Sequence, residues 1–253
     1  MTKDKKYRLV TVIGILLASL FISILVEAGI DLKANPFTKA MPISWNEAYF
    51  KLIDSPDEAD LEKGEIVVAL KRLDDDTIMA QSIGLIEAGP EECARVVHDY
   101  NNYTSIMPYT VESRIVRSFA LEGENAGAET FDFWAKVSVF GFQTSYLIRV
   151  VQLTDPGSHR YSSFWTLVRN PAAVSGCIDS DGRPCENDLD MNIGSSRFEP
   201  YKGNLNRTLY TYTLKIKGKS WTQCCGLKVG CGSSMRDVTK AIRKAVIKEQ
   251  QNG

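Results

Sequence analysis

Residues 82–108 read SIGLIEAGPEECARVVHDYNNYTSIMP, and this stretch does most to decide the fold. The first residues of this stretch belong to the run Thr77–Ala88, in which the hydrophobic pattern has a period of two and predicts a strand. Gly89-Pro90-Glu91-Glu92 then predicts the start of a helix, because proline suits the first turn and the two acids suit the positive end of the helix dipole. Asn101-Asn102 breaks this helix, which we expect to reach Tyr100. A short helical turn is predicted over Tyr103–Met107, before the closing proline.

A period of two continues on both sides of this stretch. Upstream, Glu65–Leu73 is predicted to form a hairpin with Thr77–Ala88 across three aspartates. Residues 170–195 are polar and rich in Gly and Asp, and they predict an irregular insertion. The remaining strands are predicted at Thr110–Leu121, Thr130–Phe140, Thr144–Leu153, Arg160–Arg169, Ser196–Tyr201 and Arg207–Lys217.

The last predicted element is a helix that begins at about Ser234. Met235, Val238, Ile242 and Ala245/Val246 form one apolar stripe, while the other side of the helix is basic. The stripe is mild, which favours packing on the sheet over a position on a membrane surface. The element order predicts an α+β fold, in which a curved antiparallel sheet wraps around one long C-terminal helix.

The opening stretch resembles that of START-like proteins in the SRPBCC superfamily, the polyketide-cyclase and coenzyme-Q-binding type. In these proteins a strand precedes a helix begun by Pro-Glu, followed by an Asp-x-x-x-Tyr-x-x-x-x-Pro run and a further strand. Here that run is Asp99, Tyr103 and Pro108, and the strand is similar to Val111-Glu112-Ser113. The resemblance extends in element order from about Leu61 to Gln250. It implies the helix-grip fold and a cavity for a hydrophobic ligand, such as a lipid, a quinone or a polycyclic molecule.

Large apolar and aromatic residues recur on one face of successive predicted strands. A filled core explains any one of them, but a single helix on a long curved sheet often leaves an apolar cavity, which is a default ligand site. Asp132 and Arg149 lie on the opposite faces of their strands, and they would orient a ligand only if those faces pointed inward. The Tyr103–Pro108 segment and the C-terminal helix are expected to act as a lid. The candidate wall residues are Phe131, Phe133, Tyr146, Tyr161, Trp165, Tyr210, Tyr212 and Met107.

The six cysteines predict disulfides rather than a metal site. No C-x2-C spacing is present, so no metal ligands are predicted, and no motif indicates a cofactor or a catalytic residue. The favoured disulfide is Cys177–Cys185, which would close the polar insertion. A second disulfide is predicted from Cys224 or Cys225 to Cys231, within the Gly-rich segment before the C-terminal helix. A bridge between this segment and the polar insertion is an open alternative. Cys93 is expected to be a small buried side chain.

The N-terminus carries a candidate membrane segment. Leu9–Val26 is free of charge and follows the basic stretch Lys3–Arg8. Its length favours an uncleaved signal anchor over a cleaved signal peptide, and the positive-inside rule then places the rest outside the cytoplasm. We expect a bacterial periplasmic location, or secretion if the segment is cleaved. The predicted domains are a signal anchor or signal peptide at 1–28, a tether at 29–60 with a short helix at Trp45–Ile53, and a START-like domain at 61–253.

The composition limits the possible functions. Of 253 residues 44% are hydrophobic and 24% are charged, which excludes a disordered chain and a polytopic membrane protein. The net charge of −1 gives no basic field for nucleic acid. The sequence predicts a non-enzymatic domain that binds a hydrophobic small molecule or lipid and is tethered to a membrane. The alternatives are a cyclase or dehydratase acting in the same cavity, which would need converging acid–base residues, and a protein-interaction module.

Overall fold

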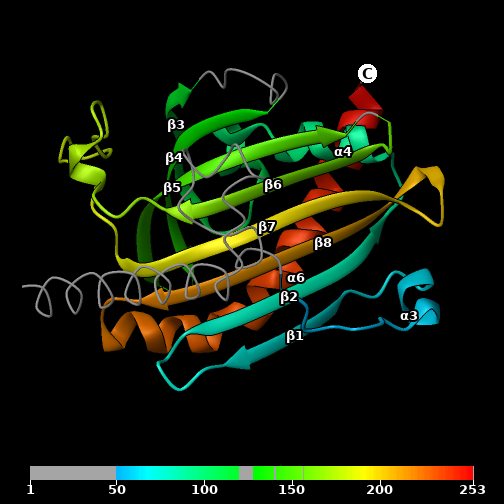
Figure 1. Cartoon of the computed structure of the whole chain (residues 1–253), viewed down its shortest axis with the longest axis horizontal. Coiled ribbons are helices and arrows are strands. Elements are labelled where there is room, and N and C mark those ends of the chain that lie inside the picture. Colours follow the sequence, from blue (N-terminus) through cyan, green and yellow to red (C-terminus); the bar gives the residue numbers. More distant parts are fainter. Residues whose placement is uncertain (1–49, 120–127, 140, 156, 253) are drawn as a thin grey trace, which may run out of the picture. The chain divides into compact units, whose positions relative to one another are not determined.

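The described residues build one antiparallel sheet. The computed structural model describes residues 50–119, 128–139, 141–155 and 157–252, with the backbone alone at 221–230 and 252 (Figure 1). Within them the sheet has eight strands in the order β1-β2-β8-β7-β6-β5-β4-β3. The strands are β1 Val67–Arg72, β2 Ile78–Ile86, β3 Thr110–Phe119, β4 Glu129–Val139, β5 Phe142–Asp155, β6 Arg160–Leu167, β7 Leu189–Tyr201 and β8 Asn204–Gly218.

Helices cover the inner face of this sheet. The long C-terminal helix α6 crosses behind the strands in Figure 1. Its Met235, Ile242 and Val246 are buried against the sheet, so the predicted apolar stripe is confirmed. The described helices are α3 Glu58–Glu62, α4 Pro90–Val97, α5 Tyr103–Ile106 and α6 Trp221–Asn252, with 3₁₀ turns η2 at Tyr100–Asn102 and η3 at Pro171–Ala173. None of the described helices is long and apolar enough to cross a membrane.

The outer face of the sheet has its own apolar contacts. At one end α3 places Leu61 in a buried cluster with Ile83 and Leu85 of β2. The segment before α3 is tied to β2, because the Gln81 side-chain oxygen accepts hydrogen bonds from the backbone N–H groups of residues 52 and 53, at 2.8 Å each. At the other end the insertion between β6 and β7 packs on β4 and β5. The segment that contains α3 and the insertion between β6 and β7 therefore each cover a part of the outer face.

The two edges of the sheet differ from its centre. β1 is one edge, with six residues, and β3 is the other. The pairing of β3 with β4 is irregular at two places, between Thr110 and Glu112 and between Ile115 and Arg117. These irregularities bend the edge strand away from regular pairing geometry.

Four predicted boundaries were wrong. Residues 50–53, the described part of the predicted helix Trp45–Ile53, are not helical, and the first described helix is α3, where the side chain of Asp57 caps the N-terminus. β7 begins at Leu189, inside the predicted insertion, because apolar residues already alternate there with polar ones. The helix opened by Pro90 ends at Val97, and Tyr100 belongs to η2.

The fourth wrong boundary is the start of the C-terminal helix. α6 begins at Trp221 rather than near Ser234, so the helix includes the Gly-rich residues 226–232, which precede the predicted start. The glycine at 232 has a packing role, since a Cβ there would lie 3.0 Å from the Leu70 side chain of β1. At this position the glycine therefore allows a close approach of the helix to the sheet.

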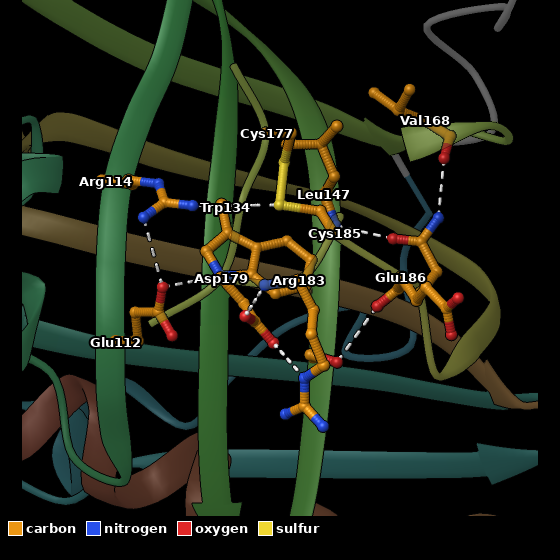
Figure 2. The surroundings of a disulfide bond; sticks show 12 residues. Glu112, Arg114, Trp134, Leu147, Val168, Cys177, Asp179, Arg183, Cys185 and Glu186 are labelled. Atoms are coloured by element: carbon orange, nitrogen blue, oxygen red, sulfur yellow. Dashed lines mark hydrogen bonds and ion pairs between the residues drawn. A yellow bond between two sulfur atoms is a disulfide. The ribbon is translucent and has the colours of Figure 1, made fainter. Parts of the chain in front are cut away.

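A disulfide closes the insertion, as predicted. Cys177 and Cys185 are bonded, with an S–S distance of 2.09 Å and a Cα–Cα distance of 5.3 Å. Figure 2 shows this bond beside Trp134 of β4 and Leu147 of β5, and these side chains form one buried cluster with Val174. The predicted second disulfide to Cys231 is wrong, because Cys231 is a buried free thiol in α6. Cys93 is also buried and free, as expected.

Among the four cysteines whose side chains the structure describes, we predict that the bonded pair alone resists alkylation once the protein is unfolded without a reductant. Under these conditions Cys93 and Cys231 should react and Cys177 and Cys185 should not, as measured by mass spectrometry of peptides. Replacing both bonded cysteines by alanine should lower the free energy of unfolding by about 2–3 kcal/mol, because the closed loop no longer restricts the unfolded chain. Labelling of Cys177 or Cys185 before reduction would contradict the assignment.

Candidate functional site

A cavity lies between the inner face of the sheet and the helices. Its volume is about 200 Å³, and its lining comes from the end of α4, η2, α5 and the segment after it, strands β3 to β8 and α6. Six of the eight predicted wall residues contribute to this lining, which the strand pairing brings together from five segments. They are Met107, Phe133, Tyr146, Trp165, Tyr210 and Tyr212.

The other two predicted wall residues lie on the same face but outside the lining. Phe131 packs edge-on against Tyr100, with ring centroids 4.8 Å apart, and is part of the closed core. Tyr161 lies opposite Phe198 in the pairing of β6 with β7, in the cluster formed with α4. Alternation in the sequence places a residue on a face of the sheet, but it does not say where along the strand the helices close over that face.

Aromatic rings form much of the cavity wall. The Trp165 ring stacks on Tyr212 with centroids 5.6 Å apart, and its Nε1–H donates a 3.0 Å hydrogen bond to Asn192 Oδ1. Trp165 lies directly over Gly194 of β7, where a Cβ would come within 2.3 Å of the indole. The absence of a side chain at Gly194 therefore makes room for the tryptophan.

The opening stretch of the sequence contributes a second group of rings. Tyr100 and Tyr103 stack with centroids 4.8 Å apart, and the Tyr103 hydroxyl donates a 2.6 Å hydrogen bond to the Val97 carbonyl at the end of α4. Both rings also meet Phe133 edge-on. Tyr100 and Tyr103 were not among the predicted wall residues, although Tyr103 belongs to the predicted lid segment. They lie in short helical turns, where no strand alternation indicates which side chains face the cavity.

A thin wall formed by Met107 and Pro108 separates the cavity from a neighbouring open groove. Met107 and Pro108 line the cavity on one side and, on the other, an open groove bordered by α4, β4 and α6. The next residue, Tyr109, has a φ of 66° and donates a 2.6 Å hydrogen bond through its hydroxyl to Asp237 of α6. That hydrogen bond raises the pKa of Tyr109. A tertiary contact therefore holds the wall in a backbone conformation that is rare for a bulky residue.

The titratable side chains that line the cavity are tyrosines and Cys231, and these are neutral at physiological pH. Burial raises the pKa of Tyr146 to about 12 and that of the Cys231 thiol to about 11. His98 lies on the open groove and not in the cavity, and burial lowers its pKa to about 4. Its Nε2 is 3.1 Å from the Ser163 hydroxyl. Among the described residues, no group of three or more His, Cys, Asp and Glu side chains could hold a metal ion.

Asp132 and Arg149 do not reach the cavity. Asp132 lies on the opposite face of β4 from Phe133 and is fully buried there. It accepts hydrogen bonds from Arg149 Nε at 2.8 Å and from Arg117 Nε at 2.6 Å. The condition for an orienting pair is therefore not met, and these three charged residues belong to the outer face.

Comparisons with solved structures identify the fold. No protein-family model matches the sequence, and no curated protein matches it. The chain is similar to human StAR-related lipid transfer protein 5, with a TM-score of 0.54 and 11% identity over 92% of this chain and 98% of that one. A STAR-related lipid transfer protein from Xanthomonas axonopodis gives 0.53 and 13% identity, over 72% and 93%. Human STARD10 gives 0.52 and 11%, over 79% and 83%. The eight-stranded sheet, the long C-terminal helix and these structures together show that the chain has the START-like helix-grip fold, as the opening stretch implied.

Proposed function

We propose that this domain binds a hydrophobic ligand in the cavity between its sheet and its helices. The observation that carries the proposal is the aromatic lining itself, in which Phe133, Tyr146, Trp165 and Tyr212 surround about 200 Å³ of space. An apolar ligand gains free energy by leaving water for such a site. The similarity to solved lipid transfer proteins supports the same interpretation at the level of the fold.

The volume of the cavity limits what it holds in this conformation. Drug-sized ligands occupy pockets of roughly 300–1,000 Å³, whereas an apolar cavity of about 150 Å³ takes a benzene molecule. The cavity here is closer to the second value. A molecule of one or two rings, or one end of a longer lipid, fits it directly. A larger ligand would need the wall at Met107 and Pro108 to move outward, and this segment is the entrance that we propose.

The lining supports binding better than catalysis. General acid–base chemistry at neutral pH needs a group whose pKa lies near 7 and that reaches the substrate. The pKa values of Tyr146 and Cys231 lie far above 7, and His98 borders the open groove instead of the cavity. For this reason we place a cyclase or dehydratase second.

The disulfide bears on location. A bond such as Cys177–Cys185 persists in oxidising compartments and is rare in the cytosol. We propose that the domain works outside the cytoplasm, in a bacterial periplasm or after secretion. The apolar run Leu9–Val26 lies outside the described residues, so membrane attachment through it stays a prediction from the sequence.

A pair of neighbouring tyrosines tests whether the cavity binds ligand. Both line the cavity, but Tyr210 is almost completely buried and its ring stacks on Phe198 with centroids 4.8 Å apart, whereas Tyr212 is less completely buried. Tyr210→Ala removes a packed core ring and should cost about 3–5 kcal/mol of stability. Tyr212→Ala should cost less, because part of its ring already faces empty space, but it should weaken binding of an environment-sensitive apolar fluorophore at least tenfold.

The measurements are thermal unfolding and fluorophore titration of the purified chain, with Tyr161→Ala as a control on the same face outside the cavity. Absence of saturable fluorophore binding to the parent chain would contradict the proposed function. A stability loss at Tyr212 as large as that at Tyr210 would mean that the site is a filled core.

A further inference from the structure

The polar atoms of the cavity are all neutral. Among the described residues that line it, none is an aspartate, glutamate, lysine, arginine or histidine. The polar side chains instead include the tyrosines and Asn192 of β7, which is 3% exposed. An ionised ligand would enter this site without a compensating charge, which is expensive in an apolar environment.

Asn192 presents a donor to the cavity. The Trp165 indole N–H can only donate, so the Asn192 atom that it contacts at 3.0 Å is the amide oxygen. This contact fixes the orientation of the amide and leaves its NH₂ group at the other end. That NH₂ group has no hydrogen-bond partner among the described residues, but it is not fully enclosed by protein atoms. Because the side chain lines the cavity, a ligand there can reach the group.

Two tyrosine hydroxyls add further donors. Tyr146 and Tyr212 line the cavity, and neither hydroxyl makes a hydrogen bond to a described residue. Burial raises the pKa of both, so both phenols keep their protons at neutral pH. A buried donor without a partner is costly, and a ligand that supplies an acceptor removes that cost.

We infer that the cavity selects a neutral, ring-bearing ligand with a hydrogen-bond acceptor, such as the carbonyl oxygen of a ketone or quinone, and rejects carboxylates and phosphates. This inference rests on the proposed function, and it names the ligand class of the same site. The stacked rings of Trp165 and Tyr212 offer a face to a flat ligand, while Tyr146, Tyr212 and Asn192 supply the donors.

Three naphthalene derivatives of similar size separate charge from hydrogen bonding. They are 2-acetylnaphthalene, which carries a neutral carbonyl, 2-ethylnaphthalene, which has no acceptor, and 2-naphthoate, which is charged. Calorimetric titration of the purified chain at neutral pH should rank the ketone about tenfold tighter than the hydrocarbon, as one or two hydrogen bonds would give. The carboxylate should bind at least a hundredfold more weakly than the ketone.

Phenylalanine substitutions test which groups donate. In the double variant Tyr146→Phe with Tyr212→Phe, the preference for 2-acetylnaphthalene over 2-ethylnaphthalene should fall from about tenfold to about threefold, because only the Asn192 donor remains. The affinity for 2-ethylnaphthalene itself should change less than about twofold, because both rings remain. Tyr161→Phe, on the same face of the sheet but outside the cavity, is the matched control and should leave the preference for the ketone unchanged.

The outcomes distinguish this inference from the proposed function. If the fluorophore binds but the carboxylate equals or exceeds the ketone, or the ketone does not bind, the cavity is a ligand site and the inferred ligand class is wrong. A ketone preference that is unchanged in the double variant also overturns the inference. If neither the fluorophore nor any of the three naphthalenes binds, the proposed function itself fails.

Discussion

Gly194→Ala is expected to lower the free energy of unfolding by about 3 kcal/mol or more and to disrupt the cavity. The new Cβ would lie 2.3 Å from Trp165 Cζ2 and 2.4 Å from the carbonyl oxygen of Thr213. The carbonyl belongs to the backbone of β8, which pairs with β7 on that side and cannot shift freely. Overpacking that forces side-chain and backbone shifts costs about 1–3 kcal/mol and occasionally more, and contacts this short with backbone place the expected cost at the upper end.

The same substitution should reduce ligand binding as well as stability. If Trp165 moves to relieve the contact, it leaves its stacking position on Tyr212 and its hydrogen bond to Asn192. The matched control is Gly157→Ala in the exposed β5–β6 turn, where the nearest contact of a Cβ is a side-chain oxygen at 3.5 Å. That variant should stay within about 0.5 kcal/mol of the parent in chemical denaturation. Equal unfolding midpoints for the two variants would contradict the packing described here.

Asp132→Ala should destabilise the protein by about 3 kcal/mol. Asp132 is fully buried between Arg117 and Arg149, whose guanidinium groups each lie 4.7 Å from the centre of the Phe119 ring. Removing the carboxylate leaves two cations facing each other on the outer face. Breaking a buried pair costs about 3–5 kcal/mol, and partial exposure of the arginines, 39% and 24%, places the expected value at the lower end.

Salt dependence separates the loss of the charge from the loss of packing. About 1 M salt screens the repulsion between the two arginines and should recover part of the lost stability, as measured by chemical denaturation in urea. Asp190→Ala, at an exposed site on β7, is the control and should change stability by less than about 0.5 kcal/mol at either salt concentration. An Asp132 variant as stable as this control would mean that the ion pairs contribute nothing.

The sequence allowed most of the fold to be predicted, because strand alternation and the apolar stripe of α6 are local signals. The boundaries failed where two signals compete. A helix was predicted to end at Ile53, but the Asp57 side chain just beyond it caps the start of α3. The C-terminal helix was predicted to begin only at about Ser234, because the close approach of Gly232 to Leu70 depends on a strand far away in the sequence.

The candidate site was predictable as a face of the sheet and not as a volume. Six of eight wall residues line the cavity, while Phe131 and Tyr161 lie where α4 and Tyr100 close the core. Asn192 could not be found from the sequence, because it lay in the segment interpreted as an insertion. Whether Asp132 faced inward or outward was also open, since the pairing register alone fixes the side of the sheet.

The irregular pairing of β3 has a consequence for self-association. A sheet with two open edges offers backbone N–H and C=O groups to a strand of another molecule, which is the first step of many aggregation reactions. Here the β3 edge is bent at two places and carries Glu112, Arg114 and Arg117, and the opposite edge strand, β1, has only six residues and ends in Lys71 and Arg72. Neither edge is a long, flat, uncharged template. The protein can therefore keep an open sheet, wide enough to wrap a helix, without recruiting its own copies into a continuous one.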